Sequence, residues 1–438
     1  MKIKGGSVMK IGKNRKGKIA AVVTATALAL TGVAISPAKA ATTITLWHIQ
    51  TNGGGPKLIQ DAVDRFQADN PGVKVEVSPI ANDAYKDKIK VALGANSAPC
   101  IFPSWGGGPL NAYVKAGQVI DLSSYLAQNN YKDRFVSASW SNVTFGNKVY
   151  GVPVENSSIA VIWYNKAIFA KYRITPPRTF DGLLAIAKKL NANGIAPFTL
   201  AGGSKWPSIM WYDYLVDRIG GSKAFTSAAL RTGGKFSDPA FVQAGEMVQQ
   251  LVKANAFVKG FNALSYDNGQ HRAPLYAGKA AMELMGNWEY GSFLADKKAT
   301  EYGFFPFPSV AGGKGDASNV LGTVGDNFYS ISSTCADKAT AFKVIQYLID
   351  DKSVAARIAD GRIPPVKGIT LTDPNSIALN ALIQKAKGVQ LWWDQYLPPE
   401  FAQLHLDQTQ ALFGLSQTPK GMADAQEALA TKLLGASS

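Results

Sequence analysis

The chain has 438 residues, of which 46% are hydrophobic and 18% are charged, which suits a globular protein with a sizeable core. Its formal net charge is +15, but eight of the positive charges lie in the first forty residues, which contain no acidic residue. The remaining basic excess is spread along the chain without dense Lys/Arg blocks. This distribution argues against nucleic-acid binding.

Residues 1–40 have the three parts of a secretory signal peptide. A basic stretch, KIGKNRKGK, precedes the apolar run IAAVVTATALALTGVAI, and a small-x-small pattern ends at Ala40. We expect cleavage before Ala41 and export to the periplasm or the extracellular cell surface. The alternative is an uncleaved membrane anchor, but the run is short for a bilayer span and rich in Ala and Thr.

The next hundred residues alternate between strand and helix patterns. Strand patterns cover 41–49, 73–80 and 100–105, and apolar residues at helical spacing cover 53–72 and 83–99. These lengths predict a βαβ-built sheet, whose ligand crevice lies beyond the carboxyl ends of its strands. Gln50, Thr51 and Trp105 lie at two of those ends.

The rest of the chain is predicted to be mostly helical, with a few strands. Thr179 is expected to cap a helix, and helical patterns continue to about residue 275. Strands are predicted at 280–286 and 327–332, one helix over 338–359, and a helical C-terminal part around 388–401.

Catalytic signatures are scarce. The sequence contains no Gly-x-Ser-x-Gly, His-Glu-x-x-His, Cys-x-x-Cys or Gly-x4-Gly-Lys-Ser/Thr motif, and His48, His271 and His405 are widely scattered. We therefore expect no cofactor, no metal and no histidine-based triad. Two carboxylates that meet in space can still hydrolyse a glycoside, so a secreted glycoside hydrolase is the alternative from another class.

The chain contains two cysteines, Cys100 and Cys335. They can form one disulfide in an oxidising compartment, and they cannot form a zinc site by themselves. Because they lie far apart in the sequence, two half-buried thiols are the other interpretation.

Tryptophans occur beside Gly, Asn and acidic residues, outside the most regular stretches. Any one indole can simply fill a core. Together they indicate a carbohydrate site, because sugar rings stack their apolar faces on indoles and their hydroxyls need carboxylates, amides or guanidiniums. The pairs Trp288–Glu289 and Trp393–Asp394 offer both kinds of partner.

The order of the segments resembles the bacterial extracellular solute-binding proteins of family 1, the sugar-binding components of ABC importers, which include the maltose-binding proteins. The resemblance extends from about residue 43 to 430. It is carried by YKDKIKVALGANSAP at 85–99, GNKVYGVPVENSSIAVIWYNKAIFAKYRITPPRTFDGLLAIAKKL at 146–190, GKAAMELMGNWE at 278–289 and GDNFYSIS at 325–332. Cys100 stands where the family usually has Asp, so the role of that carboxylate does not carry over.

The resemblance implies an α/β, two-lobe periplasmic-binding-protein fold of the type II-like kind, with mixed sheets flanked by helices and the ligand cleft between the lobes. Lobe 1 is expected to contain 41–152 plus 309–349, and lobe 2 to contain 153–308 plus 350–438. The resemblance also implies a monomer that catalyses nothing. It would capture a carbohydrate by hinge bending and deliver it to the ABC transporter permease subunits in the membrane.

The resemblance further implies which side chains meet the ligand. The expected ligand-binding residues are Gln50, Thr51, Trp105, Glu155, Asn156, Trp206, Trp211, Asn287, Trp288, Glu289, Asp326, Asn327, Arg362, Trp392, Trp393 and Asp394. For Asp326 and Glu155 the alternative is a hinge hydrogen bond or a helix cap. The stretch WGGGPLNAYVKAGQVIDL at 105–122 is similar to the branch that binds short plant-derived oligosaccharides such as xylobiose. Cello-oligosaccharides, maltose-type glucans, amino sugars and monosaccharides remain open.

Overall fold

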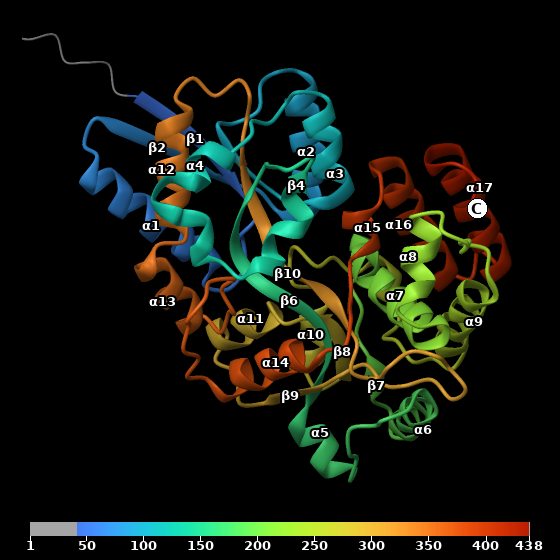
Figure 1. The fold of residues 1–438 in the computed structure, drawn as a ribbon. Coiled ribbons are helices and arrows are strands. Elements are labelled where there is room, and N and C mark those ends of the chain that lie inside the picture. Colours follow the sequence, from blue (N-terminus) through green and yellow to red (C-terminus); the bar gives the residue numbers. More distant parts are fainter. Residues whose placement is uncertain (1–41, 438) are drawn as a thin grey trace, which may run out of the picture. The chain divides into compact units, whose positions relative to one another are not determined.

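The first part of the fold is a parallel sheet with helices between its strands (Figure 1). The computed structural model describes residues 42–437, and the expected signal peptide and its cleavage site at Ala41 lie outside the described residues. The elements in chain order are β1 (Thr42–His48), α1 (Gly55–Asp69), β2 (Val73–Pro79), α2 (Asn82–Gly94) and β3 (Ile101–Ser104). Because β1 pairs in parallel with both β2 and β3, the predicted βαβ-built sheet is confirmed.

Two long antiparallel strands, β6 (Val152–Asn165) and β10 (Val320–Ile331), continue this sheet. The strand order is β2–β1–β3–β10–β6–β8–β7, with β7 at Ala196–Phe198 and β8 at Ala280–Gly286. β9 (Tyr302–Phe305) pairs with β6, and β11 (Val389–Gln390) pairs with β10. The strand predicted at 327–332 is therefore the last part of a longer one.

Short elements precede β6 and helices fill most of the remaining chain. Before β6 lie α3 (Gly107–Lys115), α4 (Ser123–Ala127), two 3-10 segments (Gln128–Arg134 and Ser137–Val143) and the hairpin β4 (Thr144–Phe145) and β5 (Lys148–Val149). After β6 lie α5 (Lys166–Lys171), α6 (Phe180–Asn191), α7 (Trp206–Gly220), α8 (Lys223–Ala229), α9 (Pro239–Lys253), α10 (Arg272–Tyr276) and α11 (Glu289–Ala295), with 3-10 turns at Gly202–Ser204 and Phe261–Ala263. The C-terminal helices are α14 (Pro374–Lys385), α15 (Trp393–Tyr396), α16 (Pro399–Phe413) and α17 (Pro419–Leu434).

Thr179 caps α6 as predicted, because its hydroxyl accepts the backbone N–H of Gly182 at 3.1 Å. Within residues 42–437, no helix has both the length and the apolar character needed to cross a bilayer.

Buried apolar side chains form two separate cores, one in each lobe. The core of lobe 1 includes residues of β1–β3, α1 and α2, and the core of lobe 2 includes residues of β8, α7, α9 and α16. The long strands contribute to both: Val152 and Val154 of β6 belong to the first core, and Ile159 to Trp163 belong to the second. The fold is thus α/β with two lobes, and the predicted residue boundaries of the lobes stay a prediction.

The helix predicted over 338–359 is wrong as a single element. The structure contains two helices there, α12 (Lys338–Leu348) and α13 (Asp351–Ala359). The carboxylate of Asp350 accepts the backbone N–H of Ser353 at 2.7 Å and so caps a new helix. Uniform apolar spacing across the break concealed this cap from the helical pattern.

Cys100 and Cys335 form a disulfide. Cys100 directly precedes β3, and Cys335 follows β10, which pairs antiparallel with β3. The bridge therefore fastens two neighbouring strands of lobe 1 at the same end. Of the two interpretations left open by the sequence, the structure has the disulfide.

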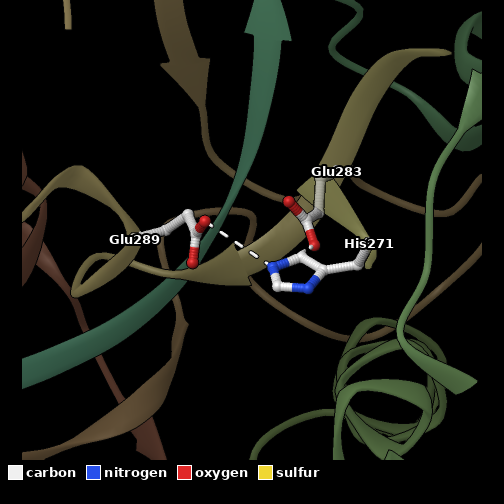
Figure 2. A group of neighbouring side chains, drawn as sticks. All are labelled: His271, Glu283 and Glu289. Atoms are coloured by element: carbon white, nitrogen blue, oxygen red, sulfur yellow. Dashed lines mark ion pairs between the residues drawn. The ribbon is translucent and has the colours of Figure 1, made fainter. Parts of the chain in front are cut away.

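The stretch GNWE connects β8 to α11, and its three side chains separate. The side chain of Asn287 fastens the end of β8 to β6, because it accepts the backbone N–H of Ile159 at 3.1 Å and donates to the carbonyl of Ser157 at 3.0 Å. Glu289 turns into the interior of lobe 2, toward His271 (Figure 2). Trp288, between them, is half-buried.

Candidate functional site

A cavity of about 130 Å³, partly open to solvent, lies between the two lobes. Lobe 1 contributes residues from the loop after β1, from the first turns of α2 and from the end of β3. These residues are Ile49, Gln50, Thr51, Asn52, Gly53, Asn82, Lys86 and Trp105. The cavity therefore lies beyond the carboxyl ends of β1 and β3, where the sequence predicts a ligand crevice.

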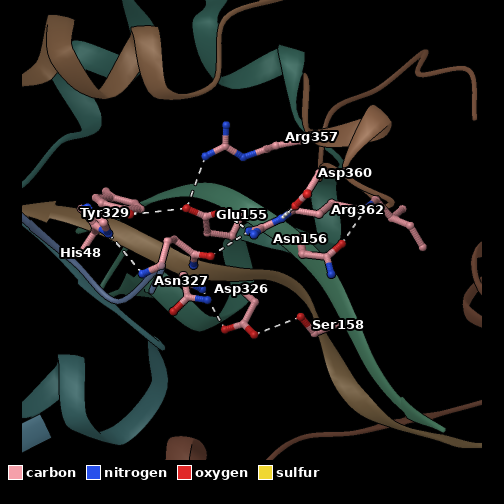
Figure 3. Close-up of polar contacts among 12 residues, drawn as sticks. His48, Glu155, Asn156, Ser158, Asp326, Asn327, Tyr329, Arg357, Asp360 and Arg362 are labelled. Carbon is pink, nitrogen blue, oxygen red and sulfur yellow. Dashed lines mark hydrogen bonds and ion pairs between the residues drawn. The ribbon is translucent and has the colours of Figure 1, made fainter. Parts of the chain in front are cut away.

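Glu155, on β6, is the centre of an ion-pair network beside the cavity (Figure 3). Arg362 donates through Nη1 to Glu155 at 2.7 Å and to the side-chain oxygen of Gln50 at 2.9 Å, and Arg357 donates to Glu155 at 3.3 Å. Burial by itself raises the pKa of Glu155, but the two guanidiniums outweigh burial and hold that pKa below its usual range. The ionised carboxylate thereby fixes Arg362 and Gln50 at the cavity.

A neutral histidine shapes the turn that carries Gln50. Nδ1 of His48 accepts the backbone N–H of Gln50 at 3.1 Å. Burial lowers the pKa of His48 to about 4, against the opposing charge of Glu155, so the imidazole remains neutral at physiological pH. A neutral ring nitrogen is required here because the imidazolium cation has no acceptor.

Asp326 and Asn327 reach the cavity from an irregular part of β10. The register of β10 against β6 shifts on both sides of Asp326, and Asn327 has a positive φ of 50°. Such bulges change the direction in which a strand's side chains point. Burial raises the pKa of Asp326 to about 6, although hydrogen bonds from the backbone of Asn327 and the hydroxyl of Ser158 act in the other direction. The side-chain oxygen of Asn327 is buried and accepts no hydrogen bond within the described residues.

Three indoles from lobe 2 form an aromatic wall. The rings of Trp206 and Trp288 have centroids 6.0 Å apart, and those of Trp288 and Trp392 are 5.9 Å apart. Gly286 makes room for the middle indole, because a Cβ at this position would lie 2.2 Å from the Trp288 ring. An aromatic wall together with the polar groups of Glu155, Arg362 and Asp326 suits a ligand with apolar faces and a polar rim.

The structure brings twelve of the sixteen predicted site residues to this cavity. They are Gln50, Thr51, Trp105, Glu155, Asn156, Trp206, Trp288, Asp326, Asn327, Arg362, Trp392 and Asp394. Their participation in ligand binding stays a prediction, because their position shows only that they face the same space.

Trp211, Asn287, Glu289 and Trp393 do not line the cavity. Trp211 and Trp393 are each 0% exposed and pack among aromatic rings of the lobe 2 core, as at Phe198 and Phe225. The side chain of Asn287 forms hydrogen bonds with the backbone of β6, and the side chain of Glu289 faces the interior of lobe 2. Trp206 and Trp392, on the same segments as Trp211 and Trp393, face the cavity instead. Residue type alone does not show whether a tryptophan faces the cavity or the core.

Several cavity residues were not predicted. They are Ile49, Asn52, Gly53, Asn82, Lys86, Ser158, Ile209, Met210, Tyr266, Asp267, Gly291, Ser292, Asp360 and Gln395. Asn52 and Asp360 lie within two positions of predicted residues, so extending the same motifs would have found them. Tyr266 and Asp267 lie in a loop, where no periodic pattern indicates which way a side chain faces.

Two lobes with a cavity between them are the architecture of the two-lobe, ligand-binding class of proteins. The chain belongs to the bacterial extracellular solute-binding protein family, whose model matches residues 50–355. The resemblance noted in the sequence is therefore confirmed.

Individual relatives agree with this family. An uncharacterized ABC transporter extracellular-binding protein of Pyrococcus horikoshii is 28% identical over 60% of each chain. The multiple sugar-binding protein of Streptococcus mutans is 24% identical over 73% of each chain. A solved structure connected with xylan utilization by the thermophilic bacterium Caldanaerobius polysaccharolyticus is 31% identical, with a TM-score of 0.83 over 88% of this chain and 99% of that chain. The match with the Pyrococcus relative spans about three fifths of that protein's length.

Proposed function

We propose that this chain is the carbohydrate-binding component of an ABC importer and that it catalyses no reaction. It would enclose a sugar between its lobes and deliver it to permease subunits in a membrane. The observation that carries this proposal is the cavity itself, where the indoles of Trp206, Trp288 and Trp392 occur together with the polar network of Glu155, Arg362 and Asp326. Pyranose rings present the matching apolar faces and hydroxyl edges.

The charges in the cavity favour a neutral ligand. Five carboxylates line it, from Glu155, Asp267, Asp326, Asp360 and Asp394, against two cations, from Lys86 and Arg362. This excess repels anionic sugars, whereas hydroxyl groups donate readily to carboxylates. The predicted ligand, a short oligosaccharide such as xylobiose, agrees with the relative connected with xylan utilization.

A thermal-shift panel of neutral mono- and oligosaccharides tests this function. A ligand that binds only the folded state stabilises it by about 2.7 kcal/mol at a hundredfold excess over its dissociation constant. We expect xylobiose to raise the melting temperature more than cellobiose, maltose, chitobiose or galactose, with no product formed. Turnover of a glycoside in the same wells would support the hydrolase alternative instead.

The proposal includes export, processing and a monomeric state without nucleic acid. The family is extracellular by description, and the first forty residues have the pattern of a signal peptide. N-terminal sequencing of exported protein should begin at Ala41, and light scattering should give the mass of one mature chain. A membrane-bound product that still begins at the first methionine would identify an anchor instead.

A further inference from the structure

Three side chains that can bind a metal converge inside lobe 2, apart from the cavity lining (Figure 2). His271 directly precedes α10, Glu283 lies on β8, and Glu289 is the first residue of α11. Each offers a nitrogen or an oxygen atom, and these atoms all lie within 4.8 Å of one another. All three side chains are 0% exposed.

The cluster holds polar atoms that have no hydrogen-bond partner. Nε2 of His271 and both carboxylate oxygens of Glu283 accept and donate no hydrogen bond within residues 42–437. Nε2 lies 3.6 Å from an oxygen of Glu283 and 3.6 Å from an oxygen of Glu289, longer than an ordinary N–H···O bond. A buried, ionised carboxylate without donors is costly, so Glu283 can stay ionised here only beside a partner of another kind, such as a cation.

These separations suit a bound cation. A tetrahedral Zn²⁺ ion about 2.0–2.2 Å from nitrogen and oxygen ligands holds them roughly 3.3–3.6 Å apart. Nδ1 of His271 lies 3.5 Å from the carbonyl oxygen of Ser265, so it can donate there and leave the Nε2 lone pair facing the carboxylates. Metal-binding imidazoles are commonly held in this way.

The surrounding charges also leave room for a cation. Arg272 donates to Glu289 at 3.2 Å, and the hydroxyl of Tyr266 lies 3.5 Å from the other oxygen of the same carboxylate. These contacts fix the orientation of Glu289. In the deprotonated state that metal binding requires, with His271 neutral and both carboxylates ionised, the two carboxylates and one guanidinium carry a single net negative charge, which a divalent ion reverses to a single positive one.

We propose that His271, Glu283 and Glu289 bind one divalent transition-metal ion of the Zn²⁺ type as a structural site of lobe 2. One imidazole and two carboxylates form a ligand set suited to Zn²⁺ or Mn²⁺. The expectation of no metal site came from the scatter of the three histidines, but this cluster needs only one of them. The ring of Tyr266, which lines the cavity, stacks on His271 with centroids 4.8 Å apart, so the ion would stiffen part of the cavity wall.

The test must allow for complete burial, because an ion cannot exchange freely with such a site. The mature chain, with its disulfide intact, is unfolded in guanidinium chloride with EDTA and refolded with or without ZnCl₂. Bound zinc is then measured by mass spectrometry, and the melting temperature is recorded; MnCl₂ serves as a second probe. We expect one zinc per chain and a melting temperature a few degrees higher in the zinc-refolded protein.

Two variants locate the site. Glu283→Gln keeps the shape of the side chain and removes a ligand, so it should lose the bound zinc and the zinc-dependent rise in melting temperature. His405→Gln is the control, because His405 is equally buried but both its ring nitrogens already have partners, Asp213 at 3.0 Å and Gln426 at 2.9 Å. It should retain one zinc.

Wild-type protein that keeps no zinc and shows no change in melting temperature overturns the proposal and leaves the cluster with protons or water only. Equal zinc retention in Glu283→Gln overturns the assignment to this cluster. Should Glu283→Gln fail to refold, the stoichiometry and melting temperature of the wild-type protein still decide whether a metal is bound. His271→Gln then serves as the second ligand variant.

Discussion

The indole N–H of Trp206 donates to the carboxylate of Asp83 at 3.2 Å, and this bond joins the two lobes. Asp83 lies in the first turn of α2, which packs on the core of lobe 1, whereas Trp206 begins α7 and packs against the core of lobe 2. The backbone N–H of Asp83 also donates to Asp267 of lobe 2 at 2.9 Å. If a sugar leaves the cavity when the lobes separate, that separation has to break the hydrogen bond between Asp83 and Trp206.

We therefore expect Asp83→Ala to accelerate ligand release. Loss of one hydrogen bond of about 0.5–1.5 kcal/mol corresponds to roughly a twofold to tenfold weaker affinity. Stopped-flow indole fluorescence, with the sugar identified in the thermal-shift panel, measures the dissociation rate. Asp87→Ala is the control, because Asp87 is exposed on the same helix. Equal dissociation rates in the two variants would show that the bond does not hold the lobes closed.

Trp288→Ala tests the aromatic wall. We expect sugar affinity to fall about tenfold to a thousandfold, because stacking on an indole contributes on the order of a few kcal/mol and each 1.4 kcal/mol is a decade. The stability of the ligand-free protein should change much less than in Trp211→Ala, which removes a 0% exposed core indole and should cost about 3–5 kcal/mol. Calorimetric titration and chemical denaturation separate the two effects. A large loss of stability with unchanged affinity would make Trp288 a core residue.

The βαβ sheet at the N-terminus was predicted well because the patterns that indicate its strands and helices are local in the sequence. Alternation in β1 and β2, helical spacing in α1 and the cap at Thr179 depend on neighbouring residues only. The break between α12 and α13 depends on one carboxylate, Asp350, and apolar spacing continues on both sides of it. The disulfide was undecidable, because the two cysteines are brought together only by the pairing of β3 with β10.

The cavity was predictable where a strand end determines the direction of a side chain, as at Gln50 and Trp105. Consecutive residues on a turn were harder to assign. In the stretch Asn287–Trp288–Glu289, the side chain of Asn287 forms hydrogen bonds with β6, that of Trp288 faces the cavity, and that of Glu289 belongs to a buried cluster. These directions follow from the close approach of the Trp288 ring to Gly286 and from distant partners such as Ser157, which one sequence does not reveal.

The disulfide should contribute stability without affecting the site. It closes a loop across a sequence separation of 235 residues, and removal of such a bridge typically costs about 2–5 kcal/mol. We expect the double variant Cys100→Ser, Cys335→Ser to unfold at lower denaturant concentration and to bind sugar as the parent protein does. Dithiothreitol should lower the stability of the parent protein and leave the double variant unchanged. Neither cysteine lines the cavity, so a change in affinity would contradict this separation of roles.

The last prediction concerns pH and follows from Asp326, whose pKa burial raises to about 6. A ligand hydroxyl that donates to the ionised carboxylate binds best above that pKa. Affinity should therefore be nearly constant above pH 7 and fall by about fivefold between pH 6 and pH 5, because half of the Asp326 carboxyls are already protonated at pH 6. Glu155, with a pKa below its usual range, stays ionised in this window, and His48, with a pKa of about 4, stays neutral.

Protonation of Asp326 should have the opposite effect on the stability of the ligand-free protein: lowering the pH weakens sugar binding but stabilises the fold at this residue. Its folded-state pKa lies above the unfolded value of about 3.9, so the ionised form is disfavoured in the folded state, and this penalty decreases as the pH falls from about 6 towards 3.9. A loss of affinity at pH 5 therefore cannot come from destabilisation by this residue. Titration calorimetry across pH 5–8 should show a flat profile for Asp326→Asn and an unchanged slope for Asp267→Asn, the matched control, because burial also raises the pKa of Asp267. If the dependence of affinity on pH persists in Asp326→Asn and disappears in Asp267→Asn, then Asp267, and not Asp326, is the carboxylate whose protonation weakens sugar binding.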